Sequence, residues 1–279
     1  MSKALLYLLM ATVGLSAWWF YQNREIPACS QPIFYKIGTF DGRFDINREN
    51  FLSALTEAEA VWESPRPEWA YGGRELFKYD SEKAKLPINL IYDYRQEVTV
   101  ELGGIEDEIE NTEADYRILE LRYKSLENEY ETLKAAYDRQ IAELERKSKV
   151  TRKEFEEAKY LEDELNGKVS EINALADRMN RLAKILNMNV NEYNAVGALR
   201  GETFEGGVYY STSDGEGINI YEFDSRDKLV RILAHELGHA LGLEHVSDSS
   251  AIMYYLNKGS AGSAVPADLK ALKTLCKQN

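Results

Sequence analysis

The stretch His235-Glu236-Leu237-Gly238-His239-Ala240-Leu241-Gly242-Leu243-Glu244-His245 decides how the rest of the chain is interpreted. Residues four apart on an α-helix lie on one face, so His235 and His239 can reach one metal ion together. Glu236 follows the first histidine, where its carboxylate can face a water molecule bound to the metal. The stretch therefore predicts a helix that carries two metal ligands and one acid–base group.

The end of the same motif supplies a third ligand. A catalytic zinc ion usually has three protein ligands and one open position. Gly242 can adopt the left-handed conformation that ends a helix, and the turn that follows would bring His245 back under the metal. The chain has 3 histidines, and all of them lie in this motif. We therefore expect one Zn²⁺ ion held by His235, His239 and His245, because imidazole nitrogen is a usual zinc ligand.

This motif resembles the zinc-binding sequence of the metzincin endopeptidases, and residues 250–254 resemble their Met-turn. Met253 lies eight residues after His245, an interval typical of the matrixin (matrix metalloproteinase-like) branch. Residues 229–234 are also similar to the start of a matrixin active-site helix. The resemblance implies a zinc-dependent endopeptidase acting on extended polypeptides, with Met253 as an apolar floor beneath the three imidazoles.

The resemblance also implies roles for single residues. Glu236 would be the general base. Substrate would pair with an edge strand near Gly207 and Val208, and Tyr254 would line the specificity pocket together with the residues up to 259. Tyr255 stands where matrixins usually have proline, whereas astacin- and serralysin-like metzincins have a tyrosine that approaches the metal. Tyr255 is therefore either a catalytic group that stabilises the oxyanion or part of the pocket wall.

The fold class expected for the catalytic domain is α+β. The resemblance implies a twisted mixed sheet with the active-site helix packed against it, built from residues 24–103 and 197–279. Short runs of β-branched and aromatic residues predict strands, and apolar residues at helical spacing predict helices. The expected strands are 32–40, 76–79, 88–92, 204–210 and 218–223, and the expected helices are 48–63, 227–241 and 267–277. Residues 211–217 are expected to form a turn-rich loop.

Residues 104–196 have a different pattern. From Ile105 onward apolar residues recur in alternating steps of four and three, which indicates a coiled coil. The rhythm lapses near residues 147–151, and Thr151 and Glu154 have capping-box spacing. We therefore expect an antiparallel coiled-coil hairpin with arms of about forty residues, inserted in the catalytic domain. It is either a solvated spacer or a docking arm for a partner protein, a second copy or a substrate.

Residues 4–21 are almost wholly apolar and carry no charge, and Lys3 precedes them. Their length lies at the border between a signal-peptide core and a membrane-spanning helix. Trp18, Trp19 and Tyr21 are typical of an aromatic belt at a membrane surface. We expect residues 1–23 to be a single-pass signal anchor in the cell membrane, with the catalytic domain exported. The alternative is a cleaved signal peptide and a secreted enzyme.

The 2 cysteines fit an exported protein. Cys29 and Cys276 can form a disulfide that ties the two ends of the catalytic domain together. The start of a matrixin-like domain runs near its last helix, which makes this pairing reasonable. The alternatives are a Cys29 thiolate bound to zinc, as in the inhibitory cysteine switch of matrixin pro-segments, and free thiols.

The net charge of -13 disfavours binding to nucleic acids or other polyanions. Calcium sites built from carboxylates and main-chain oxygens stay open, and the sequence does not locate one. A rival interpretation of the whole chain is a membrane-anchored interaction protein, with the hairpin as its working part and an idle peptidase-like domain as its scaffold. The intact histidines and Glu236 count against it, because an idle enzyme need not keep all four residues.

Overall fold

The computed structural model describes residues 28–64, 75–200, 205–256 and 262–277. The chain divides into two compact units. The first, which we call the sheet unit, combines Met1–Glu97 with Thr203–Asn279. The second, the helical unit, is Val98–Glu202.

The sheet unit contains a five-stranded sheet with the order β2-β1-β3-β5-β4. The strands are β1 (Ile33–Phe40), β2 (Phe77–Tyr79), β3 (Leu86–Leu90), β4 (Gly207–Thr212) and β5 (Gly215–Ile220). The pairs β1–β2, β1–β3 and β3–β5 are parallel, whereas β4 is antiparallel to β5. Ile88 of β3 lies opposite Ile218 of β5. Strands from both sides of the helical unit in the sequence therefore form one mixed sheet, and β4 is at its edge.

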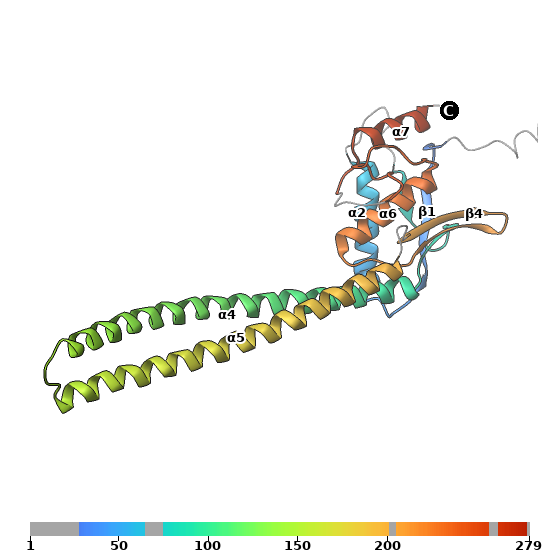
Figure 1. The fold of residues 1–279 in the computed structure, drawn as a ribbon. Helices are drawn as coiled ribbons and strands as arrows, with labels where there is room; N and C mark the ends of the chain where they lie inside the picture. The colour runs from blue at the N-terminus through green and yellow to red at the C-terminus, as the bar shows by residue number, and fades with distance from the viewer. Residues whose placement is uncertain (1–27, 65–74, 201–204, 257–261, 278–279) are drawn as a thin grey trace, which may run out of the picture. The chain divides into compact units, whose positions relative to one another are not determined.

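Two helices, α2 (Arg48–Glu63) and α6 (Arg226–Leu241), belong to the same core as the sheet (Figure 1). Asn47 caps α2 by accepting a hydrogen bond from the main-chain N–H of Asn50. Trp62 is almost fully buried, and its Nε1 donates to the carbonyl oxygen of Ala234 over 2.8 Å. A buried aromatic side chain of this size stabilises the fold by roughly 1.5–3 kcal/mol, so Trp62 fixes α6 firmly against α2.

The order of strands and helices is as predicted, and the bounds of three strands differ by two residues or more; the one predicted at 204–210 is Gly207–Thr212. The strand predicted at 88–92 lies at Leu86–Leu90, and the one predicted at 218–223 is Gly215–Ile220. The predicted loop at 211–217 was wrong, because β4 and β5 continue into it and leave only residues 213–214 between them. Residue 204 of the predicted fourth strand lies outside the described residues.

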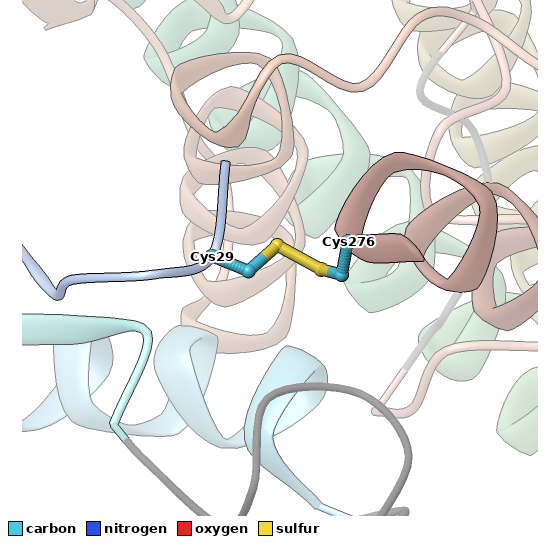
Figure 2. Close-up of a disulfide and its surroundings, with 2 residues drawn as sticks. All are labelled: Cys29 and Cys276. Carbon is cyan, nitrogen blue, oxygen red and sulfur yellow. A yellow bond between two sulfur atoms is a disulfide. The ribbon is translucent and has the colours of Figure 1, made fainter. Parts of the chain in front are cut away.

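The last helix of the sheet unit is α7 (Pro266–Lys277). Cys276, near its end, forms a disulfide with Cys29, which precedes β1 (Figure 2). Their Cα atoms are 5.4 Å apart, a usual separation for such a bond. The disulfide ties the start of the sheet unit to its end, and it leaves the Cys29 sulfur bonded rather than free to bind a metal.

The helical unit contains α5 (Arg152–Arg200) and all of α4 (Tyr94–Glu145) except its first four residues, and the two helices run antiparallel (Figure 1). Thr151 and Glu154 form the expected reciprocal cap: the Thr151 N–H donates to Oε2 of Glu154, and the Glu154 N–H donates to Oγ1 of Thr151. At the other end, Leu102, Ile105 and Val196 are buried together. The supercoiled packing of a coiled coil stays a prediction.

Both helices are longer than the predicted arms, with 52 and 49 residues. Helix α4 starts before the predicted boundary at residue 104 and runs through Gly103 and Gly104. A glycine inside a helix costs only about 1 kcal/mol relative to alanine, so two of them do not end a long helix. No helix of the described chain is long and apolar enough to span a membrane. The predicted anchor lies in residues 1–27, outside the described part.

Candidate metal centre

Helix α6 carries two of the three histidines and ends where the third must return. Ser225 caps its start by accepting a hydrogen bond from the N–H of Lys228. At its end Gly242 has φ 99° and ψ 17°, the left-handed conformation that favours glycine. The N–H of Leu243 then donates to the carbonyl oxygen of Gly238 over 2.9 Å. The chain reverses after the helix, and His245 comes back beside His235 and His239.

The three imidazoles converge through their Nε2 atoms. The Nε2–Nε2 distances are 3.1 Å from His235 to His239, 3.2 Å from His239 to His245 and 3.3 Å from His245 to His235. A tetrahedral zinc ion with Zn–N bonds of about 2.0–2.1 Å has ligand atoms about 3.3 Å apart. The triangle of nitrogen atoms therefore has the size that three zinc ligands require.

Hydrogen bonds on the far side of two rings fix which nitrogen faces the centre. Nδ1 of His235 lies 2.7 Å from the carbonyl oxygen of Ile252, and Nδ1 of His239 lies 2.9 Å from that of Leu243. A carbonyl oxygen can only accept, so each Nδ1 carries the hydrogen and each Nε2 presents a lone pair. Lone pairs this close repel one another unless a cation lies between them. The donor set therefore fits a metal ion.

Burial also favours the neutral rings that bind metals. It lowers the pKa of His235 to about 4 and lowers that of His239. Among the described residues, His235, His239 and His245 form the single group of three or more His, Cys, Asp or Glu side chains that could hold a metal ion. The described side chains thus offer no such group for calcium, and a calcium site stays unplaced.

Glu236 lies beside the first ligand, and the sheet edge holds it. Its side chain is buried, and Oε2 accepts a hydrogen bond of 2.6 Å from the main-chain N–H of Tyr209 in β4. Burial raises the pKa of Glu236 to about 7, although the Tyr209 N–H opposes this shift. A carboxyl group with this pKa can both take and give a proton near neutral pH.

Strand β4 approaches α6 very closely. A Cβ atom added to Gly207 would lie 2.6 Å from Cγ2 of Ile232 and 3.1 Å from Cγ of Glu236. A Cβ atom on Gly206 would lie 2.7 Å from Cδ1 of Ile232. Two successive glycines therefore let the edge strand reach the helix and the Glu236 carboxylate.

One side of β4 faces away from the sheet, because β4 is its last strand. The carbonyl oxygen of Gly206 accepts from the N–H of Tyr221, so the main-chain groups of Gly206 point toward β5. Main-chain groups alternate in direction along an antiparallel strand. Those of Val208 therefore also point toward β5, and those of Gly207 and Tyr209 point away from the sheet.

The Met-turn lies under the ligands. Met253 is fully buried, and a Cβ atom added to Gly238 would lie 2.4 Å from its sulfur. The buried carboxylate of Asp268, in the first turn of α7, accepts hydrogen bonds from the N–H groups of Ile252 at 2.9 Å and Met253 at 3.0 Å. The last helix thus holds the turn that contains Met253.

The two tyrosines after Met253 contact each other. The ring centroids of Tyr254 and Tyr255 are 4.8 Å apart, and a hydrogen bond with Tyr255 raises the pKa of Tyr254. The Tyr255 side chain is 59% exposed. This arrangement is that of residues on a surface wall, and the catalytic role of Tyr255 stays a prediction. Residues 257–259, expected in the specificity pocket, lie outside the described residues.

Sequence reasoning did not find three residues that bond to Glu236 or to the Met-turn: Tyr209, Asp268 and Arg231, whose Nη2 donates to the carbonyl oxygen of Ala251. Tyr209 acts through its main chain, which leaves no side-chain signal. Asp268 lies two residues after Pro266, where an acidic residue caps a helix, and it does accept from the N–H of Val265 over 3.0 Å. That signal predicts the cap but not the contact with the Met-turn. Arg231 occupies a position on α6 that faces the core.

Comparison with known proteins supports the interpretation of the motif. The family model described as Matrixin matches residues 110–275, more than half of the 279 residues. The match includes the three histidines, Glu236 and the Met-turn. No curated protein and no solved structure gave a significant match. The matrixin match and the three-histidine cluster together support a zinc metallopeptidase in general, and the chain belongs to the matrixin family.

Proposed function

We propose that this protein is a zinc endopeptidase that hydrolyses peptide bonds of extended polypeptides by Glu236-assisted attack of water. One observation carries the proposal. Three histidine nitrogens form a triangle of zinc-binding size, and a buried carboxylate beside them is held by the edge strand. The arrangement supports a site in which a metal ion, Glu236 and the edge of β4 would act together.

When bound, zinc supplies a Lewis acid that lowers the pKa of a water ligand toward about 7 and polarises the substrate carbonyl. The protein residues do the rest. Tyr209 holds Oε2 of Glu236, which leaves Oε1 as the oxygen that takes the proton from the attacking water. Glu236 then gives this proton to the leaving amine, so the same group serves as base and acid. Its raised pKa suits both steps.

The open edge of β4 is the proposed substrate-binding site. The main-chain groups of Gly207 and the carbonyl oxygen of Tyr209 point away from β5, so an extended peptide can pair with them and add a strand to the sheet; the Tyr209 N–H is bonded to Glu236. This places a scissile bond next to Glu236. Main-chain pairing gives affinity for any extended sequence, and pockets near Tyr254 would supply side-chain preference.

We also propose that the enzyme works outside the cytoplasm, anchored by residues 1–23 or released after their cleavage. The disulfide between Cys29 and Cys276 supports this location, because disulfides persist in oxidising compartments.

The test combines a metal measurement with a kinetic one. We expect one zinc ion per chain by elemental analysis of the purified protein. The protein should cleave unstructured casein, and Glu236→Ala should lower the rate by at least about 10²–10⁴-fold while zinc remains bound. Equal cleavage by the wild type and Glu236→Ala would refute the mechanism.

A second candidate function uses the helical unit as a docking arm. Ile118 and Leu121, close together on α4, are 63% and 69% exposed, which favours contact with a partner. In a protein that acts only by docking, Glu236→Ala would leave partner binding unchanged. Substitution of both apolar residues by serine would then abolish partner binding.

A further inference from the structure

A buried arginine lies one helical turn before the first histidine. Arg231 is 1% exposed, and its Nη2 donates to the carbonyl oxygen of Ala251 over 2.7 Å. Its Nε is buried and has no hydrogen-bond partner among the described residues. A guanidinium group is expensive to bury, and an unpaired donor adds to the cost. An apolar side chain of similar size would fill this space at a lower cost.

The position of Arg231 on α6 relates it to the metal site. Arg231 and His235 are four residues apart and lie on one face of the helix. They contact successive carbonyl groups of the Met-turn: Arg231 that of Ala251, and His235 that of Ile252, through Nδ1 at 2.7 Å. The helix thus binds the turn through two consecutive peptide groups.

A buried carboxylate, that of Asp268, binds the same segment, residues 251–253, through its N–H groups. The Asp268 carboxylate accepts from the N–H groups of Ile252 and Met253, and Arg231 donates to the carbonyl oxygen of Ala251. The peptide dipoles of the turn therefore lie between a buried cation and a buried anion. A shift of this segment would move the Ile252 carbonyl away from His235, and that hydrogen bond sets which nitrogen of His235 faces the metal.

We propose that Arg231 is a positioning residue for the metal centre. It holds Ala251 so that the Ile252 carbonyl orients the His235 ring, and its contribution is metal affinity rather than stability of the fold. This inference rests on the proposed zinc site. The proposed role explains why a cationic side chain, which is costly to bury, lies at a position where packing alone would favour an apolar residue.

The test compares variants with and without the donor. Arg231→Met and Arg231→Leu remove the hydrogen bond and fill the space, whereas Arg231→Lys keeps a cationic donor. Leu229→Met is the matched control, because Leu229 is fully buried on the same helix and the substitution conserves its volume. Zinc affinity is measured by competition with a chromophoric chelator, and the absorption of the Co²⁺-substituted protein reports ligand geometry. Thermal unfolding of the metal-free protein reports the fold.

We expect Arg231→Met and Arg231→Leu to bind zinc about 10–100-fold more weakly, the usual effect of losing an outer hydrogen bond to a ligand. Their metal-free melting temperatures should equal or exceed that of the wild type, and their Co²⁺ absorption should change. Arg231→Lys should recover most of the affinity, and Leu229→Met should retain it. If only one of Arg231→Met and Arg231→Leu folds, that variant alone is enough for the test.

Wild-type zinc affinity in a folded donor-free variant would overturn this inference and leave the proposed function intact. Absence of stoichiometric zinc from the wild type would overturn both. An equal loss of affinity in Leu229→Met would also refute a specific role for Arg231.

Discussion

The main-chain N–H of Tyr209 donates to Oε2 of Glu236 over 2.6 Å, which joins the edge strand of the sheet to the residue between the two helical metal ligands. In the proposed mechanism, the strand that would bind the substrate also holds the general base. A strand that pairs with β4 lies against the same edge that holds the base.

Removing this N–H should lower turnover without breaking the sheet. In Tyr209→Pro the lost N–H points away from β5, and proline is tolerated on edge strands in this orientation. A hydrogen bond to a charged group is worth about 1.5–3 kcal/mol, so we expect kcat to fall by about 10–100-fold. Tyr209→Ala, which keeps the N–H, is the control and should stay within a few-fold of the wild type. Equal kcat values for the two variants in peptide cleavage would contradict the role of this bond.

Gly207→Ala should damage both stability and activity. The added Cβ would lie 2.6 Å from Cγ2 of Ile232, a separation that forces the strand or the helix to move. Overpacking of this kind costs about 1–3 kcal/mol, and the shift should also misplace Glu236. Gly104→Ala is the matched control, since its Cβ would meet nothing within 4 Å in a helix, and it should stabilise slightly. Chemical denaturation of both variants checks the prediction, and a Gly207→Ala protein as stable as the wild type would count against the close approach.

Loss of the disulfide should destabilise the sheet unit. The bond joins residues 247 positions apart, so it restricts the unfolded chain strongly. We expect the Cys29→Ser, Cys276→Ser double variant to lose about 2–5 kcal/mol of unfolding free energy. Wild-type protein in a reducing agent should unfold at the same temperature as the variant. A variant with an unchanged melting temperature would show that the bond contributes nothing to stability.

The turn of the helical unit should depend on pH through Glu154. Hydrogen bonds from Lys147 and then Thr151 lower the pKa of Glu154 from 4.5 to about 2. Since the folded pKa is below the ordinary value, the ionised group favours the folded state. This contribution is complete above about pH 4.5 and is lost as the pH falls toward about 2. The melting temperature of Glu154→Gln, measured by circular dichroism, should therefore be lower than that of the wild type at pH 6 and equal to it at pH 2. A difference that persists at pH 2 would exclude this charge as its source.

Much of the candidate metal centre depends on residues that are close in the sequence, so it could be predicted from the sequence alone. His235 and His239 are one helical turn apart, and Gly242 ends the helix by its own conformational freedom. These relations need no knowledge of distant segments. The caps of α2 and α5, at Asn47 and Thr151, were predictable for the same reason.

The rest depends on contacts between distant segments. The approach of β4 to α6 is visible only once Gly207 lies beside Ile232. The loop expected at residues 211–217 formed strands because Tyr210 covers Gly217, where a Cβ atom would lie 2.4 Å from the tyrosine hydroxyl. Turn-forming composition gave no sign of this cross-strand contact.

The helix pair lies between β3 and β4 in the sequence, whereas β3 pairs with β5 in the sheet, which sets an order of assembly. Asn89 and Asn219 bond across these neighbouring strands although 130 positions separate them, so the sheet cannot be completed until the chain beyond α5 has been synthesised. The helices make mainly local contacts and should form first. By bringing Ile105 and Val196 together they shorten the loop that the strands must close, which lowers its entropy cost. In this order of assembly, early formation of the helices would favour the pairing of β3 with β5.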